Sequence, residues 1–281
     1  MPTNKISHDL SRTAFVVNVS RSEKVMLSKD IYAHLWITDE ARDLYKRVGS
    51  EVYPYDDLFI SLRHRFFYEK QKEFIKTHNN PAIINIGSGF TNYPFLLEGK
   101  FEYVEVDLEN IIYYKKERIE KFIQEAIIPF RDVYYYPIDL RNVIDREYLR
   151  SKLNGAIASS NRSLIIMEGL TFFLDENTLD YLFKTLGSIQ KKGSEIIFDF
   201  WKPDAMTYPV LQKLKTFLEG NFGYTLKDYY LLDKDYIESK KDFVISEMKT
   251  IQDIEKEYAS TNIFENKDNV IPANLCTLVK L

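Results

Sequence analysis

Glycines and carboxylates follow several apolar, β-branched segments of the chain, and such residues can bind a nucleotide-like ligand. Gly87-Ser88-Gly89 comes directly after segment 82–86, and Glu105-Val106-Asp107 ends the next such segment. Asp139-Leu140 and Glu168-Gly169 follow two further segments. Glycine allows the backbone to approach a ligand closely, and a carboxylate after the second strand can accept hydrogen bonds from ribose hydroxyls. Each acidic residue alone is more often a helix cap or a solvated charge, but the set indicates a ligand site at one sheet edge.

The glycine motif is incomplete as a dinucleotide signature. In the pattern G-x-G-x-x-G the third glycine position holds Asn92, so pyrophosphate binding is not specifically supported. We expect a helix to begin near Thr91 and to present its unpaired N–H groups to the ligand. A tight strand-to-helix turn is the alternative interpretation of the two glycines. A nicotinamide-dependent oxidoreductase is disfavoured because no Tyr-Lys or His-Asp pair stands at a strand end.

Strand-like segments alternate with segments of helical periodicity through the middle of the chain. Apolar residues recur at helical spacing over 56–77, and Asn79-Asn80-Pro81 ends that pattern. We predict strands at 82–86, 101–106, 133–138, 163–167 and 195–200, and helices at 56–77, 108–124 and 176–190. This alternation predicts an α/β fold with a doubly wound, mostly parallel sheet.

The two ends of the chain differ from this alternation. Residues 1–60 contain short amphipathic pieces, and Thr38-Asp39-Glu40 is typical of a capped helix start. After Trp201 we expect a helix near 210–218, followed by β-rich stretches that add antiparallel edge strands. Those stretches lie around 229–232, 243–251 and 275–281.

We expect one domain over residues 1–281, because no repeat or flexible linker divides the chain. Within it, residues 80–281 form the α/β core. Residues 1–60 are predicted to form an N-terminal helical lid over the strand-end pocket, where closure would exclude water.

The motifs, taken in order, resemble the leucine carboxyl methyltransferase-like branch of the S-adenosylmethionine-dependent methyltransferases. The resemblance covers roughly residues 10–200, and the ordered set is far more specific than any one member. It is carried by Ser11-Arg12-Thr13-Ala14, Arg63-His64-Arg65-Phe66-Phe67, Ile84-Asn85-Ile86-Gly87-Ser88-Gly89, Glu105-Val106-Asp107, Asp139-Leu140-Arg141 and Glu168-Gly169-Leu170-Thr171-Phe172-Phe173-Leu174.

The resemblance implies a Rossmann-like methyltransferase fold with S-adenosylmethionine as the cofactor. It also implies a role for each matching position. Gly87 and Gly89 would lie against the cofactor, and Asp107 would hold the ribose. Asp139 and Leu140 would flank the adenine. Glu168 would lie near the methionine amino group, and Arg63 and Arg12 would face the methionine carboxylate or the substrate.

The chain departs from the family pattern at positions that concern the acceptor. Residues 90–97, Phe-Thr-Asn-Tyr-Pro-Phe-Leu-Leu, lack the aspartate and both arginines that the family usually carries after the second glycine. Phe173 stands where the family often has a tyrosine that can bond an acidic substrate. We expect Arg63, Phe173 and Tyr32 to position the acceptor.

Methyl transfer from a sulfonium requires alignment of nucleophile, methyl and sulfur more than it requires acid–base groups. A carboxylate acceptor is already ionised at neutral pH, whereas a hydroxyl benefits from a general base. The four histidines His8, His34, His64 and His78 lie outside the strand-end motifs, so we assign no general base and interpret them as surface or packing residues. The leading hypothesis is therefore O-methylation of a carboxylate on a small metabolite or peptide. Methylation of a hydroxyl or phenol, and a non-catalytic cofactor-binding protein of the same fold, are the alternatives.

The composition of the chain disfavours several other classes of protein. The net charge of −4 lacks the basic excess of a nucleic-acid-binding protein, and no apolar run is long enough for a membrane span. The single cysteine, Cys276, forms no internal disulfide and no zinc-finger motif, which fits a reducing cytoplasm. We therefore expect a cytoplasmic enzyme with a small-molecule or peptide acceptor and with no metal site.

Overall fold

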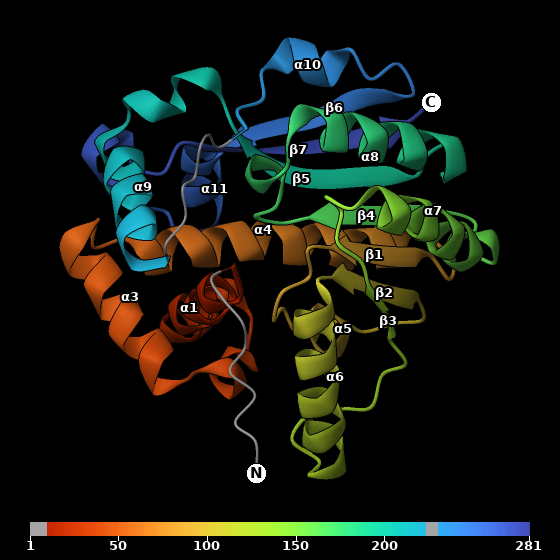
Figure 1. The fold of residues 1–281 in the computed structure, drawn as a ribbon, viewed down its shortest axis with the longest axis horizontal. Helices are drawn as coiled ribbons and strands as arrows, with labels where there is room; N and C mark the ends of the chain where they lie inside the picture. Colours follow the sequence, from red (N-terminus) through yellow and green to blue (C-terminus); the bar gives the residue numbers. More distant parts are fainter. Residues whose placement is uncertain (1–9, 223–229) are drawn as a thin grey trace.

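The computed structural model describes residues 10–222 and 230–281, and the side chains of residues 10–12 and 222 lie outside that description. At its centre is a seven-stranded sheet in the order β3-β2-β1-β4-β5-β7-β6 (Figure 1). The strands are β1 (Ala82–Ile86), β2 (Glu102–Asp107), β3 (Tyr134–Pro137), β4 (Ser163–Met167), β5 (Glu195–Trp201), β6 (Phe243–Thr250) and β7 (Ala273–Lys280).

The predicted doubly wound sheet is confirmed. Strands β1 to β5 pair in parallel, while β7 runs antiparallel between β5 and β6, as expected for the C-terminal part. Every residue of β1 and β4 is buried, which explains why these strands read as continuous apolar runs. The strand order reverses between β1 and β4, because β1 pairs with both β2 and β4. In open α/β sheets this reversal opens a crevice where ligands bind.

Helices cover both faces of the sheet. They are α1 (Leu10–Glu23), α2 (Val25–Ser28), α3 (Asp39–Glu51), α4 (Asp56–Thr77), α5 (Tyr93–Leu96), α6 (Glu109–Gln124), α7 (Val143–Ala158), α8 (Glu176–Ile189), α9 (Pro209–Phe222), α10 (Lys234–Glu238) and α11 (Ile251–Tyr258). Short 3-10 turns are η1 (Ala33–Trp36), η2 (Thr171–Phe173), η3 (Pro203–Thr207), η4 (Ile263–Glu265) and η5 (Lys267–Asn269).

Alternation along β1 shows how the two layers form. Ile83 packs in a core with α4, α9 and α11, whereas its neighbour Ile84 packs in a second core with α7 and α8. Successive strand residues point to opposite faces, so each strand feeds both cores. Figure 1 shows α7 and α8 on one side of the strands and α4 on the other.

The N-terminal part is helical, as expected. The Thr38 side chain accepts a hydrogen bond from the Ala41 N–H at 3.1 Å and caps α3. Helix α1 contacts α3 and α4, and α3 contacts α9, so these helices lie together beside the sheet (Figure 1). The lid function assigned to residues 1–60 stays a prediction.

A buried polar network fastens this N-terminal part to the glycine loop. Arg21 Nε lies 3.0 Å from Asp30 Oδ2, and the Asn92 side-chain amide donates to Asp30 Oδ1 at 2.8 Å. Arg21 also donates to the Phe90 carbonyl at 3.2 Å, and the Trp36 indole N–H donates to Asn92 at 2.8 Å. Asn92 occupies the third glycine position of the dinucleotide pattern, so its role here is to bind the N-terminal elements.

Two predicted elements are wrong in type or extent. Residues 230–232 form no strand, because their backbone makes single hydrogen bonds, Tyr230 N–H to Phe172 O and Leu232 N–H to Trp201 O. Residue 229 of that expected strand lies outside the described residues. The helix expected near Thr91 is only α5, which starts at Tyr93 and has four residues.

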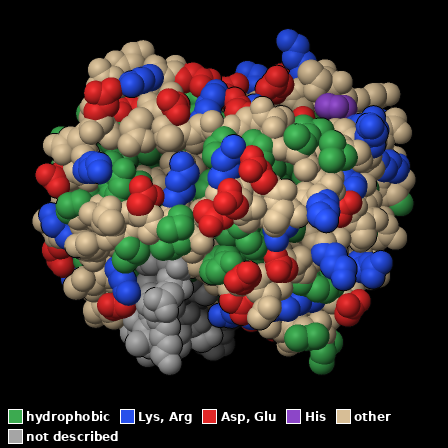
Figure 2. Space-filling view, turned by 90° about the horizontal axis from the view of Figure 1, so that it is seen from above, with side chains coloured by type: hydrophobic (Ala, Val, Ile, Leu, Met, Phe, Trp, Pro, Cys, Tyr) green, Lys and Arg blue, Asp and Glu red, His purple; other side chains and the backbone are tan. Residues whose placement is uncertain are grey.

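None of the helices in the described part of the chain has both the length and the apolar character needed to cross a membrane. On the face seen in Figure 2, lysine and arginine side chains alternate with aspartate and glutamate. That face therefore carries no extended surface of one charge.

Candidate active site

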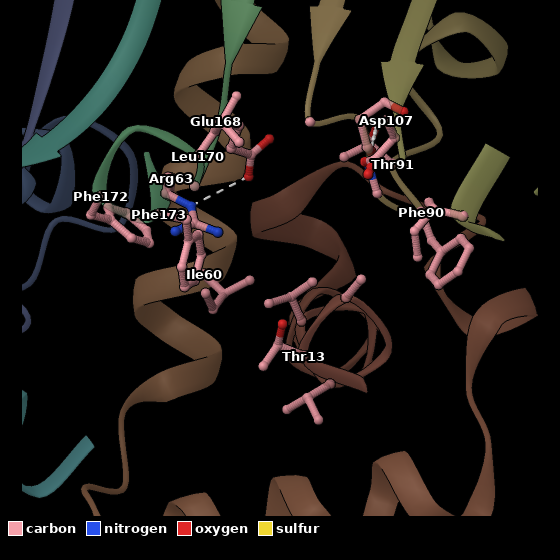
Figure 3. A pocket seen from close by; sticks show the side chains of 18 of the residues that line it. Thr13, Ile60, Arg63, Phe90, Thr91, Asp107, Glu168, Leu170, Phe172 and Phe173 are labelled. Atoms are coloured by element: carbon pink, nitrogen blue, oxygen red, sulfur yellow. Dashed lines mark hydrogen bonds and ion pairs between the residues drawn. The ribbon is translucent and has the colours of Figure 1, made fainter. Parts of the chain in front are cut away.

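A cavity of about 290 Å³ lies at the carboxyl ends of β1, β2 and β4, at the reversal of strand order. Its lining includes most of the positions singled out in the sequence: Arg63, Gly87, Gly89, Asp107, Asp139, Leu140, Glu168 and Phe173. Side chains of α1, α3, α4 and α9 complete the wall. In Figure 3, Asp107, Thr91 and Phe90 lie on one side, and Arg63, Glu168, Phe172 and Phe173 lie on the other.

The glycine loop after β1 owes its shape to Gly87. Its φ is +71°, and a Cβ atom at this position would lie 3.0 Å from Leu170 Cδ1. The Gly87 and Ser88 N–H groups both donate to the Val106 carbonyl, at 2.8 and 3.2 Å. Glycine is therefore required both by the positive φ and by the Leu170 side chain, which itself lines the cavity.

Asp107 lies at the end of β2 and braces the same loop. Its Oδ2 accepts the Gly89 N–H at 2.7 Å, and its Oδ1 accepts the Leu108 N–H at 2.7 Å. Burial raises the pKa of Asp107, and the two N–H groups oppose that rise. Each carboxylate oxygen can accept a second hydrogen bond, so both oxygens can also accept hydrogen bonds from the ribose hydroxyls.

A cluster of buried charges stands at the opposite side of the cavity. Arg63 Nε lies 3.4 Å from Glu168 Oε1, and its Nη1 lies 3.5 Å from Asp199 Oδ2 (Figure 3 shows the first pair). The Tyr93 hydroxyl donates to Glu168 Oε2 at 2.6 Å. The three charged groups carry a net charge of −1, which complements a ligand with an ammonium, a sulfonium and one carboxylate.

Asp199 also fixes the turn that carries Glu168. Its Oδ1 accepts the Gly169 N–H at 2.6 Å, and its backbone carbonyl accepts the Thr171 hydroxyl at 2.6 Å. The side chain is fully buried in β5, and this burial raises the pKa of Asp199 to about 6 despite the neighbouring Arg63.

We expect Asp199→Asn to remove a pH dependence of stability. A raised folded pKa means that the folded state binds the extra proton, so this contribution is present below pH about 4 and is lost as pH rises through about 6. A shift of about two units corresponds to roughly 3 kcal/mol. The free energy of unfolding of the wild type, relative to that of the Asn variant, should fall by up to that amount between pH 4 and 7. A difference in free energy of unfolding between the wild type and the variant that stays constant from pH 4 to 7 would contradict this prediction.

The residues predicted to flank an adenine follow β3. Leu140 is buried in the cavity wall, and Asp139 is half-buried and pairs with Arg141, with Nη2 to Oδ2 at 2.8 Å. Hydrogen bonding to Arg141 lowers the pKa of Asp139. The Ile138 N–H donates to the Asp107 carbonyl at 2.8 Å. This segment therefore lies beside Asp107, the residue expected to bind the ribose.

The remaining wall of the cavity is mainly apolar and aromatic. Phe172 stacks on Trp201, with ring centroids 4.1 Å apart, and lies 4.8 Å from the Phe173 ring. Helices α3, α4 and α9 add Leu44, Val48, Phe59, Ile60, Leu214, Phe217 and Leu218. A wall of this composition suits a largely apolar ligand.

The structure does not bring Tyr32 into the cavity. It lies beside η1 and packs against a cluster that includes Trp36, Phe15 and Phe90. The side chain of Arg12 lies outside the described residues, as does His8.

The three described histidines are packing or surface residues. His34 is exposed, and His78 stacks on Phe74, with ring centroids 4.2 Å apart. His64 is fully buried between the Ser28 carbonyl and the Tyr93 ring, and burial holds its pKa well below the usual value. His64 is also absent from the cavity lining.

Sequence reasoning missed Asp56, which lines the cavity, and Asp199 and Tyr93, which bond to the lining residues Arg63 and Glu168. Asp199 carried a usable signal, because it is the single charge in the apolar run Ile196-Ile197-Phe198-Asp199-Phe200-Trp201, and a charge there requires a buried partner. Asp56 stands at the start of the helical pattern over 56–77, where an acidic residue is ordinary, so its type gave no sign of a role in the cavity. Tyr93 carried no signal that separates it from the other nineteen tyrosines.

A family model described as leucine carboxyl methyltransferase matches residues 12–187, which is more than half of the chain. The chain belongs to the leucine carboxyl methyltransferase family. It is an S-adenosylmethionine-dependent methyltransferase, and the predicted family, enzyme class and cofactor are confirmed. Among curated proteins, no sequence match was found.

Solved structures share the fold of this leucine carboxyl methyltransferase family member at low sequence identity. A protein from Thermobifida fusca assigned to the methyltransferases is 12% identical, with a TM-score of 0.67 over 99% of this chain and 96% of its own. A DUF574 family protein from Streptomyces avermitilis is 10% identical, with a TM-score of 0.63 over 96% and 97%. Magnesium protoporphyrin IX methyltransferase from Synechocystis with bound SAH is 12% identical, with a TM-score of 0.50 over 86% and 95%.

The residues of the cavity fit S-adenosylmethionine. Asp107 can accept from the ribose, Glu168 can face the methionine ammonium, and the Arg63 guanidinium can meet the methionine carboxylate. The buried Asp199, which pairs with Arg63, adds a second negative charge beside the cavity. The cofactor, when bound, supplies an electrophilic methyl group. The protein's part is to orient the acceptor atom and to exclude water. Among the described residues, no group of three or more His, Cys, Asp or Glu side chains could hold a metal ion.

Proposed function

We propose that this methyltransferase transfers the methyl group to an oxygen atom of a small acceptor held at the apolar end of the cavity. The observation that carries the proposal is the continuity of one cavity, from Asp107 and Glu168 to the apolar side chains of α3, α4 and α9. An acceptor in that space lies beside the group that donates the methyl. The single buried cysteine, Cys276, is in keeping with a reaction in the cytoplasm.

A carboxylate acceptor is the candidate that the family description supports, since that description names a carboxyl group. A carboxylate needs no general base. The matched range ends at residue 187, however, so it does not include α9 or Trp201, which wall the acceptor end.

A hydroxyl acceptor is the second candidate, and two contacts favour it. Arg63 already faces Glu168 and Asp199, so its charge is compensated before any acceptor arrives. Asp56, one of the residues that line the cavity, can accept a proton from a hydroxyl.

Base treatment of the methylated product separates the two candidates. The protein is incubated with cell extract and methyl-labelled S-adenosylmethionine, and the labelled products are treated with sodium hydroxide. A methyl ester releases its label as volatile methanol, whereas a methyl ether keeps it. Label found only on nitrogen or sulfur, identified by mass spectrometry, would contradict O-methylation.

We expect Arg63→Lys to weaken cofactor binding while leaving acceptor preference unchanged. Lysine offers a point charge in place of two parallel donors, and a lost charge-assisted bond costs about 1.5–3 kcal/mol. The dissociation constant for S-adenosylhomocysteine, measured by calorimetry, should therefore rise about tenfold or more. Arg150→Lys, which changes an exposed arginine on α7 outside the cavity lining, is the matched control. Unchanged cofactor affinity with a selective loss of turnover on acids would instead assign Arg63 to the acceptor.

A further inference from the structure

The acceptor end of the cavity combines apolar walls with one carboxylate. Helices α3, α4 and α9 contribute nine described residues to the lining, and the only charged ones are Asp56 and Arg63. The others are apolar, among them Val48, Phe59 and Phe217. We call this part of the cavity the acceptor chamber.

Helix α9, which closes the chamber, is fastened to α3. Arg47 of α3 donates to the Asn221 side chain at 2.6 Å, and its guanidinium lies 5.3 Å from the centre of the Phe217 ring. The Phe217 ring therefore has a fixed position relative to α3. A wall of this kind favours a flat apolar ligand that packs against rings.

Hydrogen bonds orient the Asp56 carboxylate at the wall of the cavity. The Ser20 hydroxyl donates to its Oδ2 at 2.7 Å, and the Tyr53 hydroxyl lies 3.4 Å from its Oδ1. The residue is half-buried and lines the cavity. Two fixed donors orient the carboxylate, and each oxygen keeps a lone pair for another donor.

The charged groups in and beside the acceptor chamber disfavour an anionic ligand. Arg63 lies seven residues after Asp56 on the same helix, about two turns away, and its two printed ion pairs are with Glu168 and Asp199. Taken together, Asp56, Arg63, Glu168 and Asp199 carry a net charge of −2. The cofactor's positive groups can compensate Glu168 and Asp199, but a carboxylate acceptor near Asp56 would meet a like charge in an apolar environment.

We propose that the acceptor is a flat, mainly apolar compound whose neutral hydroxyl donates a hydrogen bond to Asp56. This inference rests on the proposed function, because it assigns the substrate class of the same site. In the transfer, the acceptor oxygen forms a bond to the methyl carbon while the bond between that carbon and sulfur breaks, with its electron pair remaining on sulfur. The hydroxyl proton passes to a carboxylate oxygen of Asp56 and then to water. Asp56 is thus a catalytic residue in this proposal.

A pair of probes with one shape and different charge tests the proposal. We expect 2-naphthol to bind the wild type, in the presence of S-adenosylhomocysteine, at least tenfold more tightly than 2-naphthoate. Asp56→Asn should strengthen 2-naphthoate binding at least tenfold and weaken 2-naphthol binding severalfold. The amide oxygen of Asn can still accept from Ser20, and a thermal melt checks that the variant is folded. The wild-type comparison of the two probes needs no variant.

Asp57→Asn is the matched control. Asp57 is the next residue on α4 but does not line the cavity, and its Oδ2 pairs with Lys24 at 3.1 Å. The same loss of one charge at this position should change neither probe's affinity by more than twofold. With S-adenosylmethionine as donor, Asp56→Asn should also lower the rate of 2-naphthol methylation at least a hundredfold.

Four results would overturn the inference. Two concern probe binding to the wild type: tighter binding of 2-naphthoate than of 2-naphthol, or no binding of 2-naphthol up to its solubility. The other two are a change in probe affinity on Asp56→Asn no larger than that on Asp57→Asn, and no methylation of bound 2-naphthol. The titrations are repeated without S-adenosylhomocysteine, and the binding of that ligand is measured separately. Failure of S-adenosylhomocysteine to bind would count against the proposed function, whereas normal binding with the wrong probe preference would count against the acceptor class alone.

Discussion

Replacing Gly87 with valine is expected to abolish cofactor binding while leaving the chain folded. The φ of +71° is unfavourable for a β-branched residue and costs about 1–2 kcal/mol. The new Cβ would also lie 3.0 Å from Leu170 Cδ1, so the valine methyl groups must displace Leu170 or the loop. Because both line the cavity, the dissociation constant for S-adenosylhomocysteine should rise at least about a hundredfold, a loss of about 3 kcal/mol.

Two further variants separate the causes of that loss. Gly155→Val on α7 introduces the same side chain at a site where a Cβ would meet nothing within 4 Å, and it should leave binding unchanged. Gly87→Ala combined with Leu170→Ala relieves the contact but keeps the positive φ, so it should recover part of the affinity. Normal binding by Gly87→Val with a native circular dichroism spectrum would show that Gly87 serves the turn alone.

The strand-end residues could be predicted from the sequence because topology alone brings them together. In a doubly wound sheet the carboxyl ends of β1, β2 and β4 meet at one edge, so Gly87, Asp107 and Glu168 converge whatever their side chains contact. The buried apolar strands gave a strong signal because both of their faces are covered. The order of the motifs along the chain, more than any single motif, indicated the family.

Residues whose position depends on tertiary packing could not be predicted in this way. Tyr93 reaches the site through tertiary packing, where its hydroxyl donates to Glu168 across the fold. Asp199 differs, because the register of β5 on β4 already places it beside Glu168. Residues 230–232 have the apolar pattern of a strand, but the edge of β5 they would need is occupied by β7, and Leu232 is buried by a loop contact. The expected helix near Thr91 fails because the Thr91 hydroxyl bonds to Ser88 O and Asn85, which holds the residue in the turn.

Replacing Asp107 with alanine is expected to weaken S-adenosylhomocysteine binding by at least tenfold. The carboxylate can accept both ribose hydroxyl protons, and each charge-assisted bond contributes about 1.5–3 kcal/mol. The Gly89 and Leu108 N–H groups would lose their acceptors as well. Calorimetry gives the affinity, and Asp132→Ala, which removes an exposed aspartate outside the cavity, should leave it unchanged.

The two roles of Asp107, binding the ribose or bracing the loop, lead to different expected affinities for nucleosides. Adenosine and 2′,3′-dideoxyadenosine differ only in the two hydroxyls that the carboxylate would accept. If Asp107 binds the ribose, the wild type should prefer adenosine by about tenfold or more, and Asp107→Ala should bind both nucleosides equally. If Asp107 only braces Gly89 and Leu108, the variant should weaken both ligands by the same factor and keep the preference. Retention of the preference would therefore contradict the assignment of Asp107 to the ribose, even if S-adenosylhomocysteine binding falls as expected.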